Sequence, residues 1–204
     1  LNLFAEEIHV LTGDHRSGKS TLGGIISGRL RRQVGSISVR GDELDRLEPA
    51  DAIALGIGMV YQSPEIDPSL TVLENLFLGR MPHFYIASRD ARRMRESCTL
   101  LFEGLGIGLD PDEKGSALTG GQKVMLELAR VVSSGASILI LDEISSRLTP
   151  RELDDLYRTL DAYRRMGKRV LYITSNMDEA FRIADRVTVL RDGLRQGTEN
   201  IQSI

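Results

Sequence analysis

The residues whose types and spacing best define a chemistry lie near the beginning of the chain, where residues 13–20 read GDHRSGKS. This stretch fits the pattern GxxxxGK[ST], in which glycines let the backbone approach phosphate oxygens and a following helix directs N–H groups toward them. We expect Lys19 to neutralise charge on the β- and γ-phosphates of a nucleotide, and Ser20 to give Mg²⁺ a hydroxyl ligand. The predicted phosphate-binding residues are Gly13, Asp14, His15, Arg16, Ser17, Gly18, Lys19, Ser20 and Thr21.

An acidic pair, Asp142 and Glu143, directly follows the apolar run SILIL at residues 137–141. Such a run is typical of a strand buried on both faces, and open α/β sheets bind ligands at the carboxyl ends of their strands. Asp142 is expected to hold Mg²⁺ directly or through water, and Glu143 to orient the attacking water. In isolation the pair would suit an acidic turn, and the phosphate loop alone would suit a kinase, a GTPase or a helicase.

A second glycine motif, LTGGQ at residues 118–122, stands just before a predicted helix. A hydroxyl and two glycines at a helix N-terminus can form another anion cradle. The same five residues would also occur in a plain glycine-rich loop or helix C-cap. The motif resembles the signature of ABC ATPases, usually LSGGQ, with threonine in place of serine. That resemblance implies head-to-tail pairing, in which the signature residues bind the γ-phosphate held by a partner. These residues are Thr119, Gly120, Gly121 and Gln122.

The resemblance to ABC ATPases covers nearly the whole chain. Gln62, after IGMVY, matches the Q-loop glutamine of the family, which approaches Mg²⁺ and the attacking water. The chain resembles in particular the first nucleotide-binding half of the ATP-binding subunits of monosaccharide importers. The stretches that carry this similarity are IGMVYQSPEIDPSLTVLENLFLGR, GGQKVMLELAR, LTPRELDDLY and IADRVTVLRDG.

One position departs from the family pattern. The stretch that aligns with the switch histidine of the family reads YITSN, so Ser175 stands where that histidine is expected, and the histidines of this chain are His9, His15 and His83. Ser175 can hydrogen-bond a phosphate or a water but carries no positive charge. Alternatively, Ser175 or Asn176 is simply the N-cap of the following helix. Loss of the histidine should slow hydrolysis more than it weakens binding.

The elements that must position these motifs alternate between strand and helix. Strands are expected at residues 8–12, 36–39, 57–61, 137–141, 170–173 and 187–190, and helices near residue 19, at 71–78, at 89–105 and after residue 121. A further helix should begin at Thr149, because Pro150 and Glu152 complete a first turn with a capping box. The order predicts an α/β fold: a P-loop NTPase (RecA-like) core with a parallel sheet and an inserted all-helical subdomain.

Composition sets the limits of this interpretation. The chain has 204 residues, a formal net charge of -3 and one cysteine, Cys98, which fits a reducing compartment. It contains no apolar run of about 18 residues that would span a membrane. We expect a single nucleotide-binding domain over residues 1–204, with a core lobe at 1–62 and 131–204 and a helical subdomain at 63–130, trimmed at both ends from a longer protein. The acidic balance argues against nucleic acid as a partner.

The expected function is Mg-ATP hydrolysis that energises a membrane importer, of a monosaccharide in particular. The resemblance implies as partners a second nucleotide-binding domain (on the same polypeptide or another), permease subunits and, indirectly, a periplasmic or extracellular solute-binding protein. It places the protein peripherally at the cytoplasmic face of the cell membrane. One alternative is a degenerate half that binds ATP and dimerises with little hydrolysis. Another is an ABC ATPase acting on DNA or ribosomes, which the acidic balance and the lack of a long coiled-coil insert disfavour.

Overall fold

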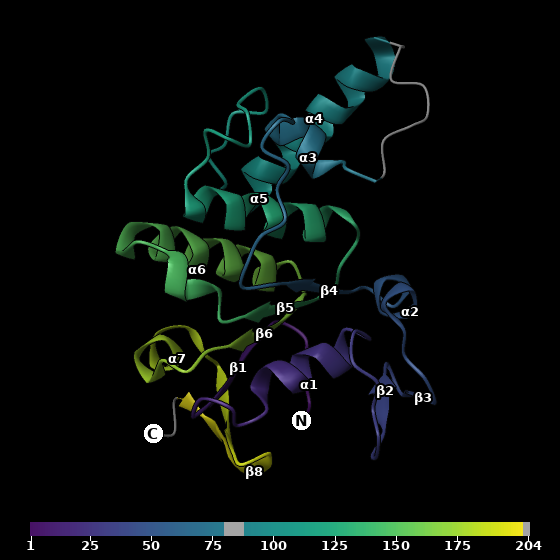
Figure 1. The fold of residues 1–204 in the computed structure, drawn as a ribbon, viewed down its shortest axis with the longest axis vertical. Coiled ribbons are helices and arrows are strands. Elements are labelled where there is room, and N and C mark those ends of the chain that lie inside the picture. The colour runs from purple at the N-terminus through teal and green to yellow at the C-terminus, as the bar shows by residue number, and fades with distance from the viewer. Residues whose placement is uncertain (80–87, 202–204) are drawn as a thin grey trace.

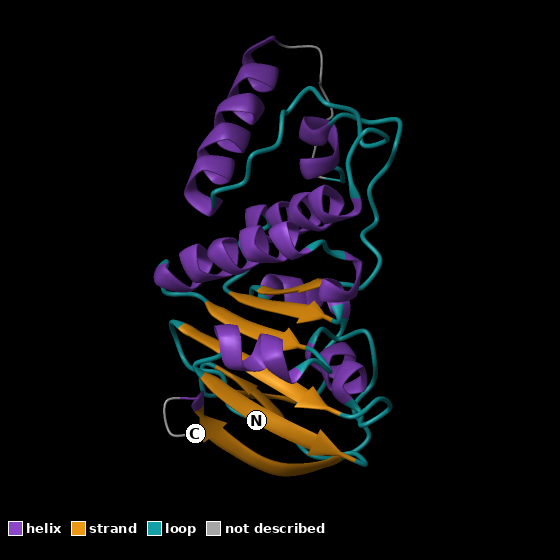
Figure 2. Cartoon of the chain, turned by 90° about the vertical axis from the view of Figure 1, so that its left-hand side faces the viewer, coloured by secondary structure: helices purple, strands orange, loops and turns teal. Residues whose placement is uncertain are grey.

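The centre of the molecule is a six-stranded sheet in the order β4-β5-β6-β1-β7-β8 (Figures 1 and 2). The computed structural model describes residues 1–79 and 88–201. The first five strands in this order (β4, β5, β6, β1 and β7) run parallel, and β8 is antiparallel to β7. Their bounds are β1 Glu7–Gly13, β4 Ile57–Val60, β5 Ile138–Asp142, β6 Arg169–Ile173, β7 Arg186–Arg191 and β8 Leu194–Asn200. The α/β class with a parallel core is therefore confirmed.

Helices cover both faces of this sheet and extend beyond one of them. They are α1 Lys19–Ile26, α2 Pro49–Ala54, α3 Val72–Leu76, α4 Ser88–Leu105, α5 Gly120–Ser133, α6 Pro150–Arg165 and α7 Met177–Ile183, with a 3₁₀ turn η1 at Ile144–Arg147. Alternate residues of β1 face opposite layers: Leu11 packs with the α1 side, whereas Val10 packs with the α5–α7 side. The run expected to be buried on both faces is β5, where Leu139, Ile140 and Leu141 have no exposed surface.

Helix α6 begins as its sequence predicted. Thr149 is its N-cap, Pro150 opens its first turn, and the N–H of Thr149 donates to Oε2 of Glu152 at 2.8 Å. Such a cap stabilises a helix by about 1 kcal/mol. One face of α6 carries Leu153, Leu156, Leu160 and Tyr163 into the same core cluster. The helix is consequently fixed at its N-terminus by its cap and along its length by apolar packing.

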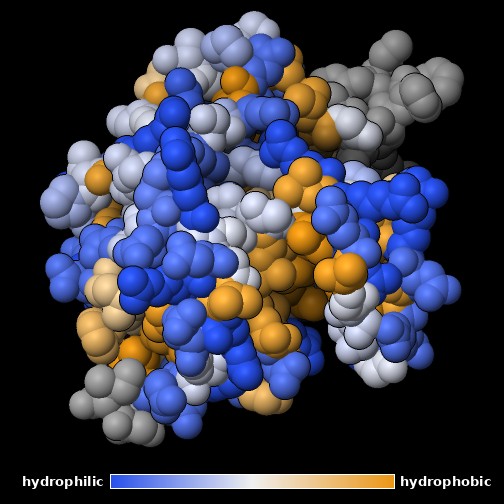
Figure 3. All heavy atoms as spheres, turned by 60° about the horizontal axis from the view of Figure 1, so that its bottom comes forward, coloured by the Kyte–Doolittle hydropathy of each residue, from blue (hydrophilic) through white to orange (hydrophobic). Residues whose placement is uncertain are grey.

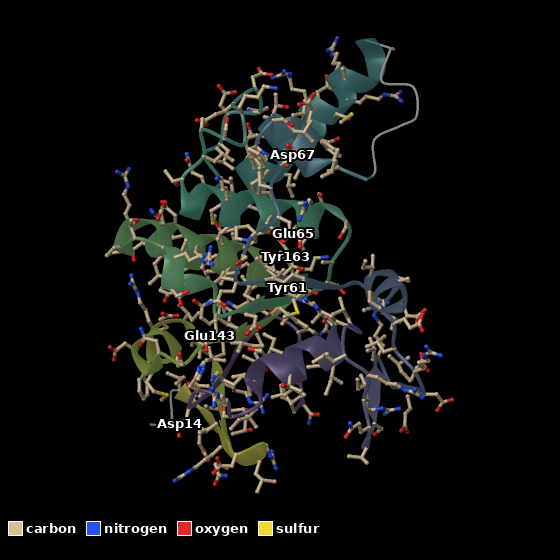
Figure 4. The ribbon with its side chains drawn as sticks, in the orientation of Figure 1. Asp14, Tyr61, Glu65, Asp67, Glu143 and Tyr163 are labelled. Atoms are coloured by element: carbon tan, nitrogen blue, oxygen red, sulfur yellow. The ribbon has the colours of Figure 1, made fainter. Side chains whose placement is uncertain are left out.

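Tyr163→Phe is expected to lower the free energy of unfolding by about 1 kcal/mol. The hydroxyl of Tyr163, labelled in Figure 4, donates to the carbonyl of Ala136 at 2.8 Å, and the side chain is fully buried. Phenylalanine would fill the same space and leave that carbonyl without its donor. Urea unfolding measures the change. Tyr61→Phe, which keeps its ring beneath the guanidinium of Arg29, is the reference variant; equal losses in the two proteins would contradict the prediction.

The helices α3, α4 and α5 lie on the side of α6 that faces away from the sheet (Figure 1). The segment that links β4 to α3 is held in place along its length, and Figure 4 labels Glu65 and Asp67 on it. The N–H of Glu65 donates to Glu127 Oε2 at 2.9 Å, and that of Asp67 donates to Asn75 Oδ1 at 2.8 Å. Helix α5 ends at Ser133, beyond the boundary expected at residue 130. No helix in the described ranges is both long and apolar enough to cross a membrane.

Besides the 3₁₀ turn η1, three short elements were not expected from the sequence: β3 (Asp42–Leu44), α2 and β8. Strand β3 forms a separate antiparallel hairpin with β2 (Ile37–Val39). Figure 3 shows apolar side chains gathered in a hollow next to the part of the chain that contains this hairpin. Strand β8 follows a turn at Asp192-Gly193, and both of these residues have a positive φ. None of the three elements supplies a residue to the site described below.

Candidate functional site

A cavity of about 510 Å³ opens where β1, β5 and β6 end. Every residue that lines it belongs to the predicted site. The lining residues are His15, Arg16, Ser17, Gly18, Lys19, Ser20, Thr21, Gln62, Asp142, Glu143 and Ser175. Because parallel strands end at one edge of a sheet, residues more than a hundred positions apart in the sequence meet here.

The loop between β1 and α1 is shaped by two glycines and a buried lysine. A Cβ at Gly13 would lie 2.0 Å from the carbonyl oxygen of Leu190, and Gly18 has a φ of 98° as the N-cap of α1. The Lys19 ammonium donates to the carbonyls of Gly13 and Asp14 at 2.8 and 2.9 Å, and only 5% of the residue is exposed. The loop therefore places a fixed positive charge and a helix N-terminus beside the cavity, which suits a phosphate chain.

The Ser20 hydroxyl lies beside Asp142 and donates to its Oδ1 at 2.9 Å. Burial raises the pKa of the Asp142 carboxyl, the Ser20 hydrogen bond lowers it, and the neighbouring charge of Glu143 raises it further. A hydroxyl and a carboxylate are hard oxygen donors, and a divalent cation would relieve this crowding of negative charge. In the described residues no cluster of three His, Cys, Asp or Glu side chains forms a metal site. The Ser20 hydroxyl and the Asp142 carboxylate fit Mg²⁺, which protein sites usually hold through one or two carboxylates together with substrate phosphates and water.

Glu143, labelled in Figure 4, lines the same cavity directly after the end of β5. Its backbone is left-handed, with a φ of 50°, and its N–H donates to the carbonyl of Ile173 at 2.9 Å. A non-glycine residue in this conformation costs roughly 1 kcal/mol, so the surrounding structure must hold it there. Oε1 lies 3.7 Å from Lys19 Nζ, and Oε2 accepts from Ser175 Oγ at 3.2 Å. This side chain could accept a hydrogen bond from a water placed beside the phosphate loop.

Ser175 belongs to the cavity and is not the N-cap of α7. That cap is Asn176, whose Oδ1 accepts from the N–H of Asp178 at 2.9 Å. Of the histidines, His15 lines the cavity, whereas His9 is fully buried in the sheet between Glu7 and Thr188. His83 lies outside the described residues. The alternative in which Asn176 caps the helix is therefore confirmed, whereas Ser175 contacts Glu143 and its part in hydrolysis stays a prediction.

The signature motif lies elsewhere, at the N-terminus of α5. Thr119 is the N-cap of that helix, and its hydroxyl accepts from the N–H of Gln122 at 3.1 Å. None of the residues 119–122 lines the cavity. Within one chain the structure thus keeps the N-terminus of α5 apart from the cavity.

Sequence reasoning missed one side chain at the signature. The hydroxyl of Thr119 donates to Oε1 of Glu152, which lies 33 positions further along the chain, at 2.8 Å. Glu152 had been identified only as the capping-box residue of α6. No spacing rule within a helix or a turn links two residues so far apart, so the sequence held no signal for this contact.

The sheet order, the glycine-rich turn from β1 into α1 and the acidic pair after β5 together define a P-loop nucleotide-binding fold. Comparison with known proteins narrows the class. Residues 1–146 match the family model described as ABC transporter. The chain belongs to the ABC transporter family.

The chain is also similar to curated relatives, and it shares its fold with solved structures. The chain is 39% identical over 196 residues to the ribose import ATP-binding protein RbsA of Chromobacterium violaceum, and 35% identical over 199 residues to that of Bacillus subtilis. These alignments cover 96% and 98% of the chain but only 39% and 40% of the relatives, so the chain spans about two fifths of their length. A nucleotide-free ATP-binding cassette from an ABC transporter superposes with a TM-score of 0.85 at 22% identity, covering 98% of this chain and 83% of the cassette. A dimeric cassette bound to ADP and Pi superposes with a TM-score of 0.79 at 23% identity, covering 98% and 88%.

Proposed function

We propose that this chain binds Mg-ATP and hydrolyses it to ADP and phosphate in order to energise a membrane importer, of a monosaccharide in particular. The observation that carries the proposal is the single cavity in which Lys19, Ser20, Asp142 and Glu143 meet. The assignment to sugar import rests on the resemblance to the ribose import proteins, which are longer than this chain.

Six side chains of the cavity have a defined part in the proposed reaction. Lys19 and the loop N–H groups bind the phosphates, and Ser20, Asp142 and Gln62 are the residues that would hold Mg²⁺. When bound, the metal neutralises charge on the β- and γ-phosphates. Glu143 accepts a hydrogen bond from the attacking water and orients it in line with the γ-phosphate. Ser175 steadies Glu143 through the 3.2 Å hydrogen bond and offers a polar contact beside the γ-phosphate.

The separation of the two cradles supports pairing with a second nucleotide-binding domain. Thr119 and Gly121 would complete the site of a partner, and the partner would complete the site of this chain. In this arrangement residues 1–62 and 131–204 form the core lobe, and residues 63–130 form the lobe that contacts the permease. The protein would then act at the cytoplasmic face of the membrane as a peripheral subunit, with a solute-binding protein contributing indirectly and with no nucleic-acid partner.

The direct test is the release of phosphate from Mg-ATP by the purified protein, together with its sedimentation with and without ATP. Turnover that requires Mg²⁺, and a dimer that forms only with ATP, are the expected results. ATP binding without turnover would instead identify a degenerate half that binds and dimerises. The absence of both ATP binding and turnover would overturn the proposal.

Ser175→His is expected to raise kcat by about tenfold or more, because a well-placed donor to the transition state contributes on the order of a hundredfold. The position lines the cavity and touches Glu143, so an imidazole there would reach the γ-phosphate region. Phosphate release under saturating Mg-ATP measures the change. Asn176→His, one residue further on and outside the cavity lining, is the control. A kcat that Ser175→His leaves unchanged would show that the serine does not limit turnover.

A further inference from the structure

An internal carboxylate sits on the signature motif at the N-terminus of α5. The Thr119 hydroxyl donates to Oε1 of Glu152 at 2.8 Å, while the N–H and the hydroxyl of Thr149 donate to Oε2 at 2.8 and 2.9 Å. One carboxylate therefore joins the beginnings of α5 and α6. This contact is separate from the capping box of α5, which uses Gln122.

Gly121, the second glycine of the motif, leaves room for this carboxylate. A Cβ at Gly121 would lie 2.2 Å from Cδ and 2.4 Å from Oε1 of Glu152, so with any larger residue at this position the Glu152 carboxylate would have to move. Hydrogen bonds from the backbone of Thr149, the hydroxyls of Thr119 and Thr149, and the backbone of Gly121 together hold the pKa of Glu152 below its usual range. The side chain is consequently an anion at neutral pH, seated where a helix N-terminus favours negative charge.

The donors that Glu152 occupies are the ones that the proposed function assigns to the nucleotide of a partner. A hydroxyl has a single proton to donate, and that of Thr119 is directed at Glu152. A γ-phosphate that approaches Thr119 and Gly121 would meet a like charge and an engaged donor. It can dock only if the Glu152 carboxylate moves away.

We propose that Glu152 is a positioning residue that keeps the signature cradle closed by an intramolecular carboxylate, which the γ-phosphate of a partner-bound ATP must displace. The inference rests on the proposed function, because it concerns the same cradle. The two carboxylate oxygens of Glu152 have separate partners. A small rotation of the carboxylate can therefore free Thr119 while Oε2 still caps α6 through Thr149. The contact thus sets how much ATP is needed for pairing and leaves the phosphate loop of the same chain untouched.

The test measures ATP-dependent dimerisation in a Glu143→Gln background, in which ATP is not consumed. Glu152→Gln retains an acceptor for Thr149 and removes the charge. We expect the ATP concentration at half-maximal dimer, measured by sedimentation velocity, to fall about five- to tenfold, since the phosphate no longer displaces a charge-assisted contact. Glu152→Asp, whose shorter carboxylate withdraws from Thr119, should shift it in the same direction. The affinity of the single chain for ATP should not change.

Glu74→Gln is the matched control. Glu74 closes the capping box of α3 by accepting from the N–H of Thr71 at 2.7 Å, as Glu152 does for α6, but it lies outside the signature. The same chemical change there should leave the dimerisation midpoint where it is. Midpoints that are equal in the parent and both Glu152 variants, or higher in the variants, would overturn the inference alone. Failure of every protein to dimerise at saturating ATP would overturn the proposed pairing, and the inference with it.

Discussion

Glu143→Gln is expected to lower kcat for ATP hydrolysis by about a hundredfold to a thousandfold while the dissociation constant for ATP stays within about threefold, the range seen when a general base or water-positioning carboxylate is lost. The amide keeps an oxygen that can accept from Ser175 but cannot take a proton from water. The change is nearly isosteric, so the left-handed backbone at φ 50° and its hydrogen bond to Ile173 need not move.

Two measurements separate this effect from a structural one. Single-turnover phosphate release reports the chemical step, and binding of a fluorescent ATP analogue reports affinity. Glu43→Gln, on exposed β3, makes the same chemical change away from the cavity and should leave both values as they are. Hydrolysis by Glu143→Gln at more than about a tenth of the parental rate would mean that another group orients the water, and the roles of Asp142 and Gln62 would then need to be examined.

The parts of the fold that the sequence predicted well are those with strong local signals. Residues 138–141 of β5 are all apolar, and the Thr149-Pro150 start of α6 combines an N-cap with a residue that suits the first helical position. The turn from β1 into α1 was also predicted, because its conformation requires glycine: Gly13 and Gly18 both have a positive φ. Such signals act over fewer than ten residues, so they survive without knowledge of the tertiary structure.

The elements and contacts that the sequence did not predict have weaker local signals or depend on residues far apart in the chain. Strand β8 reads LRQGTEN and lies at the sheet edge with most of its residues exposed, so no apolar alternation indicates it. Helix α2 begins with Pro49 after Glu48, whose N–H donates to Asp51 at 3.1 Å, a start signal that could have been read. The contacts of Ser175 with Glu143 and of Thr119 with Glu152 depend on how strands and helices are stacked, which no single sequence displays.

Lys19→Ala is expected to weaken ATP binding by about 10- to 100-fold, which corresponds to roughly 1.5–3 kcal/mol for hydrogen bonds to a charged group. The Lys19 ammonium is the buried cation of the phosphate loop, and its three donors are shared between the carbonyls of Gly13 and Asp14 and the neighbourhood of Glu143. Replacing it removes the charge that balances the phosphates and leaves Glu143 without its cation. Isothermal titration with Mg-ATP measures the loss directly.

Two further variants test whether the loss of ATP affinity comes from the geometry of Lys19 and not from the loss of a positive charge in general. Lys114→Ala removes the same charge from an exposed residue whose ammonium donates to the carbonyl of Ser69 at 2.9 Å, away from the cavity, and it should leave ATP binding within about twofold. Lys19→Arg keeps the charge, but a planar guanidinium cannot enter a loop in which the ammonium lies 2.8 Å from one carbonyl and 2.9 Å from the next. The Lys19→Arg protein is therefore expected to bind ATP nearly as weakly as the Lys19→Ala protein. If Lys19→Arg bound ATP with the parental affinity, the positive charge alone would account for the contribution of Lys19. The close backbone fit around Lys19 would then have no part in nucleotide recognition.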